Sequence, residues 1–244
     1  MTAIAISCHP HISRGLAVGL AAGATQWRPG LGAVVRHSEI FAAASEASGA
    51  AAVLALQLDQ ADPQHAERPW LWVQDKAARR LGGRPYRPGL PSPLRHRLIH
   101  VAADKPEDAL FALEEGLRCR DLAFVVGEIA GNPRALGLTA SRRLSLAAQK
   151  HGIPLWLVRL DAKRDLGSAR MRWDVRAAAS SRPQWNAAAP GTPAWEAEQF
   201  RAHTWQQGRW VLEESGAGLG VRPSTGSGRA EIGEEIELPN ARSA

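Results

Sequence analysis

Two patterns of apolar positions alternate through the middle of the chain. Short apolar runs bounded by charges, Pro or Gly predict buried strands at residues 69–75, 97–104, 122–129 and 153–160. Apolar residues at spacings of three and four predict helices, one capped by Asp104 and one running from Thr139 to Gly152. A further helix, rich in Ala and Leu, is predicted at residues 42–58. The alternation predicts an α/β fold with a mostly parallel central sheet and right-handed crossovers.

The pattern of apolar and polar positions changes after residue 160. Segments 168–175, 193–202 and 208–215 are short, alternating or aromatic, and separated by Pro, Gly and Ala, which predicts C-terminal antiparallel strands that extend the sheet. From residue 216 the Gly, Ser, Pro and Glu content rises and large apolar residues become rare. We therefore expect a lead segment at 1–29, one domain at 30–215 and a disordered tail at 216–244.

Composition indicates a soluble protein. The 244 residues are 45% hydrophobic and 22% charged, which is typical of one sizeable globular domain. The apolar stretch near the N-terminus has no basic leader and is interrupted by Arg14, so we expect a cytoplasmic protein with no membrane contact. Cys8 and Cys119 are too few for a disulfide framework, and Cys119 is expected as a small core residue at a helix end.

The formal net charge is +6, and its distribution along the chain is uneven. Between Asp121 and Arg176 there are 10 Lys or Arg against 5 Asp or Glu. Such a field favours association with nucleic acid or with an acidic partner. A solvated, Arg-rich surface is the alternative interpretation.

The strand ends place charged residues where parallel sheets bind ligands. Asp75, Asp104, Glu128 and Arg159 are expected beyond or near the carboxyl ends of the strands. A phosphate-cleaving site there also needs a glycine loop followed by Lys and Ser or Thr. No lysine of the chain follows a glycine, so this Walker A loop is missing, and Gly49 in "EASGAAAV" brings no cation with it. We expect no enzymatic activity and no bound cofactor.

Other chemistry is weakly indicated. The eight histidines are scattered without metal-ligand spacing, so no metal site is predicted. Arg142 and Arg143 lie in the first turn of a predicted helix, where they oppose the helix dipole, a cost that binding could justify. A solvated or ion-paired arginine pair is the alternative. We take four arginines as candidates for DNA or partner binding: Arg142, Arg143, Arg170 and Arg172.

Several segments together resemble one family. "DALFALEEGLRC" (108–119) and "LTASRRL" (138–144), with "SEIF", "PWLWVQD" and "SARMRW", resemble the ImuA proteins, RecA-like accessory factors of the bacterial mutasome. The match covers about residues 30–214. Where relatives commonly have adjacent His and Glu, this chain places Ser38 between His37 and Glu39. The resemblance implies that residues 30–215 form a RecA-like domain, and that Glu128 is either a vestige of a magnesium-associated acid or a structural cap on the next turn.

The resemblance also implies a function. It is a role in SOS-induced, error-prone translesion synthesis, with an ImuB-like Y-family protein, an error-prone replicative-type polymerase and RecA as partners, and DNA as a further ligand. A RecA-type DNA-dependent ATPase with a degenerate phosphate loop is the first alternative. A SulA-like inhibitor of cell division is the second, because such inhibitors also resemble a shortened RecA core.

Overall fold

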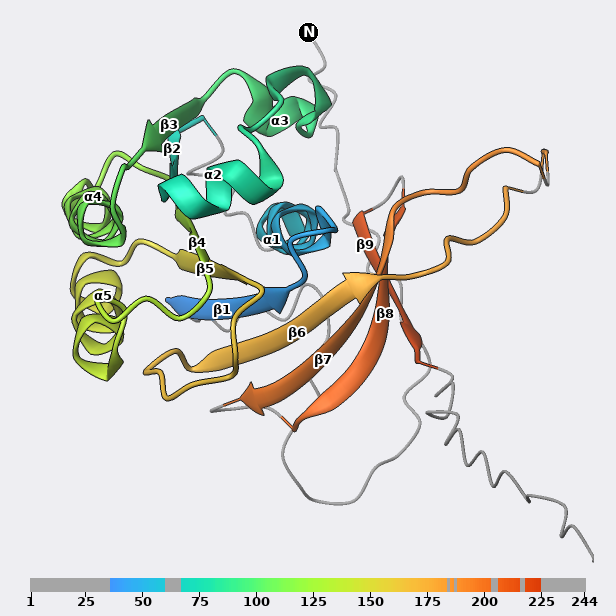
Figure 1. The fold of residues 1–244 in the computed structure, drawn as a ribbon. Helices are drawn as coiled ribbons and strands as arrows, with labels where there is room; N and C mark the ends of the chain where they lie inside the picture. Colours follow the sequence, from blue (N-terminus) through green and yellow to red (C-terminus); the bar gives the residue numbers. More distant parts are fainter. Residues whose placement is uncertain are drawn as a thin grey trace, which may run out of the picture.

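The structure, a computed structural model, describes residues 36–59, 67–183, 185–186, 188–202, 206–215 and 218–224. These residues form one sheet in the order β3-β2-β4-β5-β1-β6-β7-β8-β9 (Figure 1). The strands are β1 (His37–Ala42), β2 (Trp70–Gln74), β3 (Leu98–Ala102), β4 (Val125–Ala130), β5 (Leu155–Leu160), β6 (Met171–Ala177), β7 (Ala194–Ala202), β8 (Gly208–Ser215) and β9 (Gly218–Pro223). The helices are α1 (Ser48–Asp59), α2 (Lys76–Gly82), η2 (Arg87–Gly89), α3 (Ser92–Arg95), α4 (Pro106–Arg118) and α5 (Leu138–His151).

The sheet has a parallel and an antiparallel half. Strands β3, β2, β4, β5, β1 and β6 pair in parallel. Strands β7, β8 and β9 continue from β6 in antiparallel pairs. The predicted α/β class, with a mostly parallel sheet flanked by helices and with C-terminal antiparallel strands, is therefore confirmed.

Helices cover both faces of the parallel half (Figure 1). On one face α1, α2 and α3 bury Ile40, Val126 and Val158. On the other face α4 and α5 bury Leu113 and Leu157. Because both faces are covered, the central strands are apolar without alternation, which is the pattern that predicted them. Strand β9 also contacts α1, so the antiparallel half curves around this helix.

The first strand was not predicted. Residues 37–42 form β1, and the helix predicted at 42–58 begins only at Ser48. Strand β1 is fully buried although it carries His37, Ser38 and Glu39. Because β1 begins with three polar residues, it lacks the apolar run that predicted the other strands. The Ala-rich stretch after it extended the predicted helix too far toward the N-terminus.

Two predicted helix starts, at Asp104 and Thr139, and the predicted burial of Cys119 are wrong. The N-cap residues of α4 and α5 are Lys105 and Gly137, and neither side chain makes a cap hydrogen bond. Asp104 instead forms an exposed ion pair with Arg79. Helix α4 begins at Pro106, whose fixed φ favours a first turn without a side-chain cap. Cys119, expected in the core, is exposed just beyond α4.

Other elements differ from the predicted boundaries. Helices α2 and α3 and strand β9 were not predicted, and β9 lies inside the tail expected from residue 216. Its residues pair with β8, so backbone pairing orders a Gly-rich segment that cannot form a core alone. The predicted lead segment at 1–29 and residues 225–244 lie outside the described part of the chain.

Three tryptophans of β6, β7 and β8 belong to the core rather than the surface. Trp173, Trp195 and Trp210 are buried, and Trp173 packs against Trp210 with ring centroids 5.9 Å apart. Trp185 is exposed on the loop between β6 and β7. Within the described residues, none of the helices has the length and apolar character that crossing a membrane requires.

Candidate functional site

The turn between β1 and α1 occupies the position where α/β sheets commonly hold phosphates. Two carboxylates of the chain fill this turn. Asp161 Oδ1 accepts a hydrogen bond from the Ala44 amide at 2.9 Å. Glu46 Oε2 accepts hydrogen bonds from the Ser48 hydroxyl and from the Ala177 amide, each at 2.6 Å, and both lower the pKa of Glu46. The turn therefore carries two acidic side chains whose oxygens already accept hydrogen bonds from the protein.

Gly49 serves helix packing rather than ligand approach. It is buried in the first turn of α1, over the carboxyl end of β1. A Cβ atom at this position would lie 2.8 Å from Ala42 Cβ and 3.1 Å from Val158 Cγ1. Glycine therefore lets α1 approach β1 and β5 closely. It does not expose amides toward solvent, as a phosphate loop requires.

Glu128 lies inside β4 and is buried beneath α2. Its Oε2 atom accepts hydrogen bonds from Gln74 Nε2 at 2.7 Å and Trp72 Nε1 at 3.1 Å. A Cβ at Gly82 of α2 would come within 3.4 Å of its Oε1 atom. Burial raises the pKa of Glu128, and the nearby charge of Asp75 also raises it, whereas the two hydrogen bonds lower it. The carboxylate therefore makes its hydrogen bonds inside the protein and is not exposed at the sheet edge.

The Glu128 network continues to the loop after α2. Gln74 donates to the Gly83 carbonyl at 3.0 Å, and its Oε1 atom lies 2.9 Å from His100 Nε2. Gly83 has a φ of 77°, a conformation that glycine tolerates best. Glu128 therefore orients Gln74, and Gln74 fixes the end of α2 against β3.

The remaining strand-end residues do not converge into one site. Asp75 caps α2 by accepting from the Ala78 amide at 2.7 Å. Asp104 pairs with Arg79 at 3.5 Å. Arg159 lies on the opposite face from Glu128, where it donates to the Gly131 carbonyl at 3.0 Å. Among the described residues, no group of three or more His, Cys, Asp or Glu side chains is arranged to hold a metal ion.

A buried charge cluster was missed by sequence reasoning. Arg172 Nε donates to Glu39 Oε2 at 2.6 Å, and both side chains are almost fully buried. Asp165 contacts both Arg159 and Arg172. Burial, the largest single effect, raises the pKa of Asp165, but the opposing effects, which include the charges of these two arginines, leave it lowered. The Arg172 guanidinium also lies 4.9 Å from the ring centre of Phe41. The cluster neutralises its own charges and ties β1, β5 and β6 together.

A chain of hydroxyl groups lies beside this cluster. His37 Nδ1 lies 2.6 Å from Ser145 Oγ, which lies 2.6 Å from Ser168 Oγ. Ser141 Oγ accepts from the Ser168 amide at 2.9 Å. Burial, with a smaller contribution from the charge of Arg172, lowers the pKa of His37 from 6.5 to about 3. His37 is therefore neutral at physiological pH and joins α5 to β1.

The four candidate arginines lie in different environments. Arg142 and Arg170 are exposed and make no side-chain ion pair within the described residues. Arg143 pairs with Glu114 of α4 at 2.6 Å and so joins the two helices. Arg172 is buried in the charge cluster, so it cannot contact a partner or DNA in this fold.

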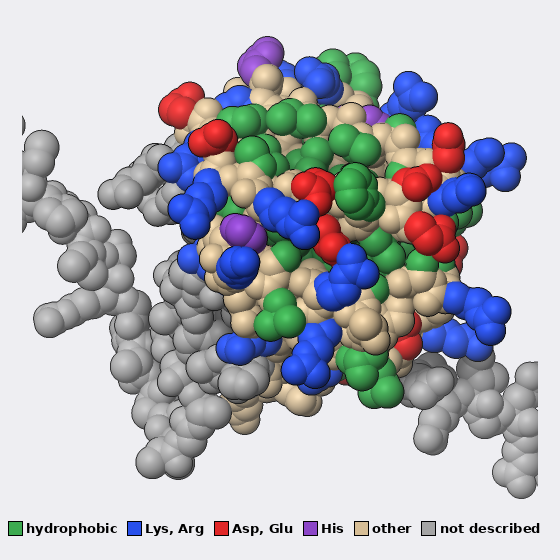
Figure 2. Space-filling view, turned by 90° about the vertical axis from the view of Figure 1, so that its left-hand side faces the viewer, with side chains coloured by type: hydrophobic (Ala, Val, Ile, Leu, Met, Phe, Trp, Pro, Cys, Tyr) green, Lys and Arg blue, Asp and Glu red, His purple; other side chains and the backbone are tan. Residues whose placement is uncertain are grey.

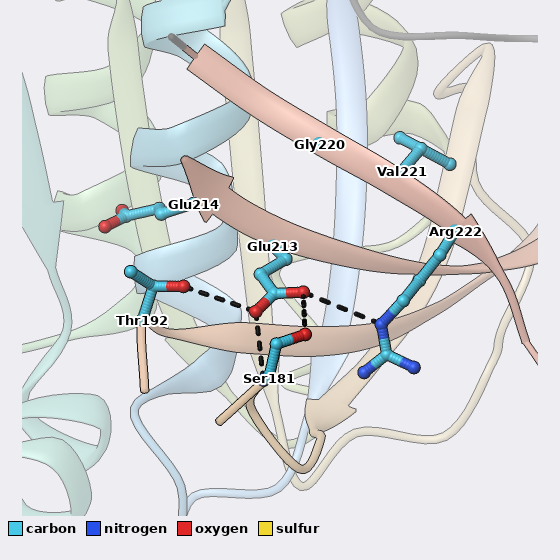
Figure 3. Close-up of a pocket in the computed structure, with 7 residues that line it drawn as sticks. All are labelled: Ser181, Thr192, Glu213, Glu214, Gly220, Val221 and Arg222. Atoms are coloured by element: carbon cyan, nitrogen blue, oxygen red, sulfur yellow. Dashed lines mark hydrogen bonds and ion pairs between the residues drawn. The ribbon is translucent and has the colours of Figure 1, made fainter. Parts of the chain in front are cut away.

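Among the described residues, two cavities involve the antiparallel strands. One of about 450 Å³ surrounds Glu213, which accepts from the Ser181 amide and hydroxyl and from Thr192 Oγ1 and pairs with Arg222 (Figure 3). These contacts fasten the β6–β7 loop to β8 and β9 and satisfy the carboxylate internally. The other cavity, about 610 Å³, is an apolar groove along α1, with Leu54, Leu58 and Trp195 in its lining.

Comparison with known proteins gives no identification: no protein-family model matches the chain, and no curated protein matches it.

Proposed function

We propose that this protein is a non-catalytic, RecA-like accessory factor in SOS-induced, error-prone translesion DNA synthesis. It acts by binding an ImuB-type Y-family protein, together with an error-prone replicative-type polymerase or RecA. The observation that supports its non-catalytic character is the acidic β1–α1 turn, where Asp161 accepts from the Ala44 amide and Glu46 accepts from the Ser48 hydroxyl and the Ala177 amide. A triphosphate would meet these two carboxylates there, and residues 43–47 of the turn supply no lysine or arginine to offset them.

The segments that resemble ImuA proteins support this proposal. Residues 108–119 form most of α4, and residues 138–144 form the first half of α5. The two helices pack side by side on one face of the parallel sheet. A RecA-like core is also expected to carry an acid on a central strand, and Glu128 has that position in β4. The same acid serves here to hold Gln74 and Trp72.

The α4–α5 surface is the part of this face that suits a protein partner. We define it by four side chains that project from the two helices: Phe111, Leu138, Arg142 and Leu146. The last three follow one another at i, i+4 and i+8, so they form a single exposed stripe along α5. Phe111 is 66% exposed on α4.

Charges of both signs surround these apolar side chains. Figure 2, which views the side where α4 and α5 lie, shows Lys and Arg interspersed with Asp and Glu and with separate hydrophobic groups. Exposed apolar side chains with a polar, mixed-charge surround are typical of protein interfaces. A nucleic-acid surface would be predominantly basic.

The α4–α5 surface can be tested by substitution. We expect the double variant Arg142→Glu/Leu146→Glu to lower affinity for the purified ImuB-type protein by about tenfold or more. The substitution at Leu146 removes a central apolar contact, and the substitution at Arg142 reverses a charge. Surface plasmon resonance with the immobilised partner measures the change. Arg182→Glu/Leu166→Glu makes the same changes at exposed loop positions and should bind as the wild type does.

Two results would contradict the proposal. Unchanged affinity of Arg142→Glu/Leu146→Glu would remove this surface. Absence of saturable binding of the wild-type protein to the ImuB-type protein, the polymerase and RecA would overturn the proposed function itself.

A further inference from the structure

A second surface is formed by a stretch of the chain that contains basic residues and no acidic ones. No Asp or Glu occurs from Lys76 to Ala103, a stretch that forms α2, η2, α3 and β3. Helix α2 follows the carboxyl end of β2, whereas η2 and α3 lead back to the amino end of β3. All three lie on the face of the sheet opposite to α4 and α5 (Figure 1). Its basic residues are Lys76, Arg79, Arg80, Arg84, Arg87, Arg95 and Arg97.

Several of these cations converge on the edge of the sheet. The turn at Gly83 sends the chain back from α2, so that Arg84 and Arg87 follow Arg79 around His100 of β3. The pKa of His100 is lowered mainly by burial and then by the charges of Arg84, Arg79 and Arg87. Arg79 also pairs with Asp104 at 3.5 Å, and Arg87 donates to the Leu98 carbonyl at 3.0 Å. These contacts hold the edge in place.

Other cations of the same surface are available to a ligand. Lys76, Arg80 and Arg84 are exposed, and none of them makes an ion pair within the described part of the chain. The surface therefore combines fixed arginines near the sheet with free cations around them. A polyanion can neutralise the free cations without first breaking an internal ion pair.

An aromatic side chain lies between two of these arginines in the sequence. Tyr86 is 74% exposed and lies between Arg84 and Arg87 in the sequence. Its ring packs beside Gly89, where a Cβ atom would be 3.0 Å from Tyr86 Cδ1, so one side of the ring is supported. Leu81 of α2 is also half exposed. An exposed ring among free cations is the arrangement with which proteins stack an unpaired base and neutralise the adjoining phosphates.

We propose that this α2–η2 surface, formed by Lys76, Arg80, Arg84, Tyr86 and Arg87, binds single-stranded nucleic acid. The arginines and the lysine contact phosphates, and the Tyr86 ring stacks on one base. An acidic protein segment would use the same charges, but it would gain less from an exposed ring held between them. A duplex would leave Tyr86 without an unstacked base. The inference deepens the proposed function by naming a ligand, but it uses none of the residues of the α4–α5 surface.

Fluorescence anisotropy with a labelled oligodeoxythymidine of about 20 nucleotides tests the proposal on the full-length protein. We expect saturable binding by the wild type. Arg80→Glu/Arg84→Glu should weaken it by at least about tenfold and reduce the slope of log K against log salt by about 1.4, for two lost phosphate contacts. Tyr86→Ala should weaken it by at least about fivefold and leave that slope unchanged. Arg134→Glu/Arg182→Glu, with the same net charge as the first variant, should bind as the wild type does.

Three outcomes would overturn the proposal. They are no binding by the wild type, wild-type affinity in both Arg80→Glu/Arg84→Glu and Tyr86→Ala, or equal weakening in the Arg134→Glu/Arg182→Glu control. Displacement of the oligonucleotide by polyglutamate, combined with wild-type affinity in Tyr86→Ala, would identify an acidic protein ligand instead. Each outcome leaves the proposed function intact, because partner binding is measured separately with nuclease-treated proteins and different variants.

Discussion

Replacing Arg172 by methionine is expected to destabilise the protein by about 3–5 kcal/mol, because a buried carboxylate then loses its cation. The Arg172 side chain is 6% exposed and that of Glu39 is 1% exposed. The guanidinium also donates to the Asp165 backbone carbonyl at 2.7 Å. Methionine fills much of the volume but supplies neither charge nor donors. The free energy of unfolding from urea titration measures the loss.

Two controls separate the buried ion pair from a general effect of removing an arginine. Arg170→Met removes an exposed arginine two positions away and should change stability by no more than about 0.5 kcal/mol. Glu39→Gln/Arg172→Met removes both charges and should recover part of the loss. A loss under 1 kcal/mol in Arg172→Met would show that the charge cluster does not hold β1 against β6.

The stability of the wild-type protein is expected to fall by about 1.6 kcal/mol through His37 alone between pH 6.5 and pH 5. The pKa of His37 is lowered from 6.5 to about 3, by burial and then by Arg172. The unfolded chain therefore takes up a proton below pH 6.5, whereas the folded protein resists it. This contribution is fully present above pH 6.5 and is lost progressively as pH falls from 6.5 toward 3.

The comparison that isolates His37 is with His37→Gln. The variant keeps a polar side chain near Ser145 but has no titrating group at this position. Both proteins share every other carboxylate and histidine, so the difference between their unfolding free energies at each pH reports His37. We expect that difference to shrink by about 1.6 kcal/mol from pH 6.5 to pH 5. Parallel pH profiles would show that His37 titrates in the folded protein as it does in the unfolded chain.

The sequence predicted the parallel half of the fold well because burial leaves a local signal there. Strands β2, β4 and β5 are covered on both faces and are therefore continuous apolar runs. Strand β1 left no such signal, since Glu39 is buried only because Arg172 lies beside it, 133 positions later in the chain. A pairing of this kind is visible only after the strands are aligned.

The site was predicted in part. Glu128 was expected at a strand end, and it does lie in a central strand, but its role depends on Gln74 and Trp72 of a neighbouring strand. Arg142 and Arg172 looked alike in sequence, and the fold exposes the first and buries the second. The basic surface on α2 and η2 did leave a signal, a long stretch without Asp or Glu, but the charge count over residues 121–176 missed it.

The acidic β1–α1 turn is expected to hold no triphosphate, and a non-catalytic role depends on this. Isothermal titration of the full-length protein with ATP and Mg²⁺ tests it directly. We expect no saturable binding up to about 1 mM ATP, and the same flat trace for Glu128→Ala. Saturable binding tighter than about 100 μM in the wild type, lost in Glu128→Ala, would contradict this expectation and establish a nucleotide site.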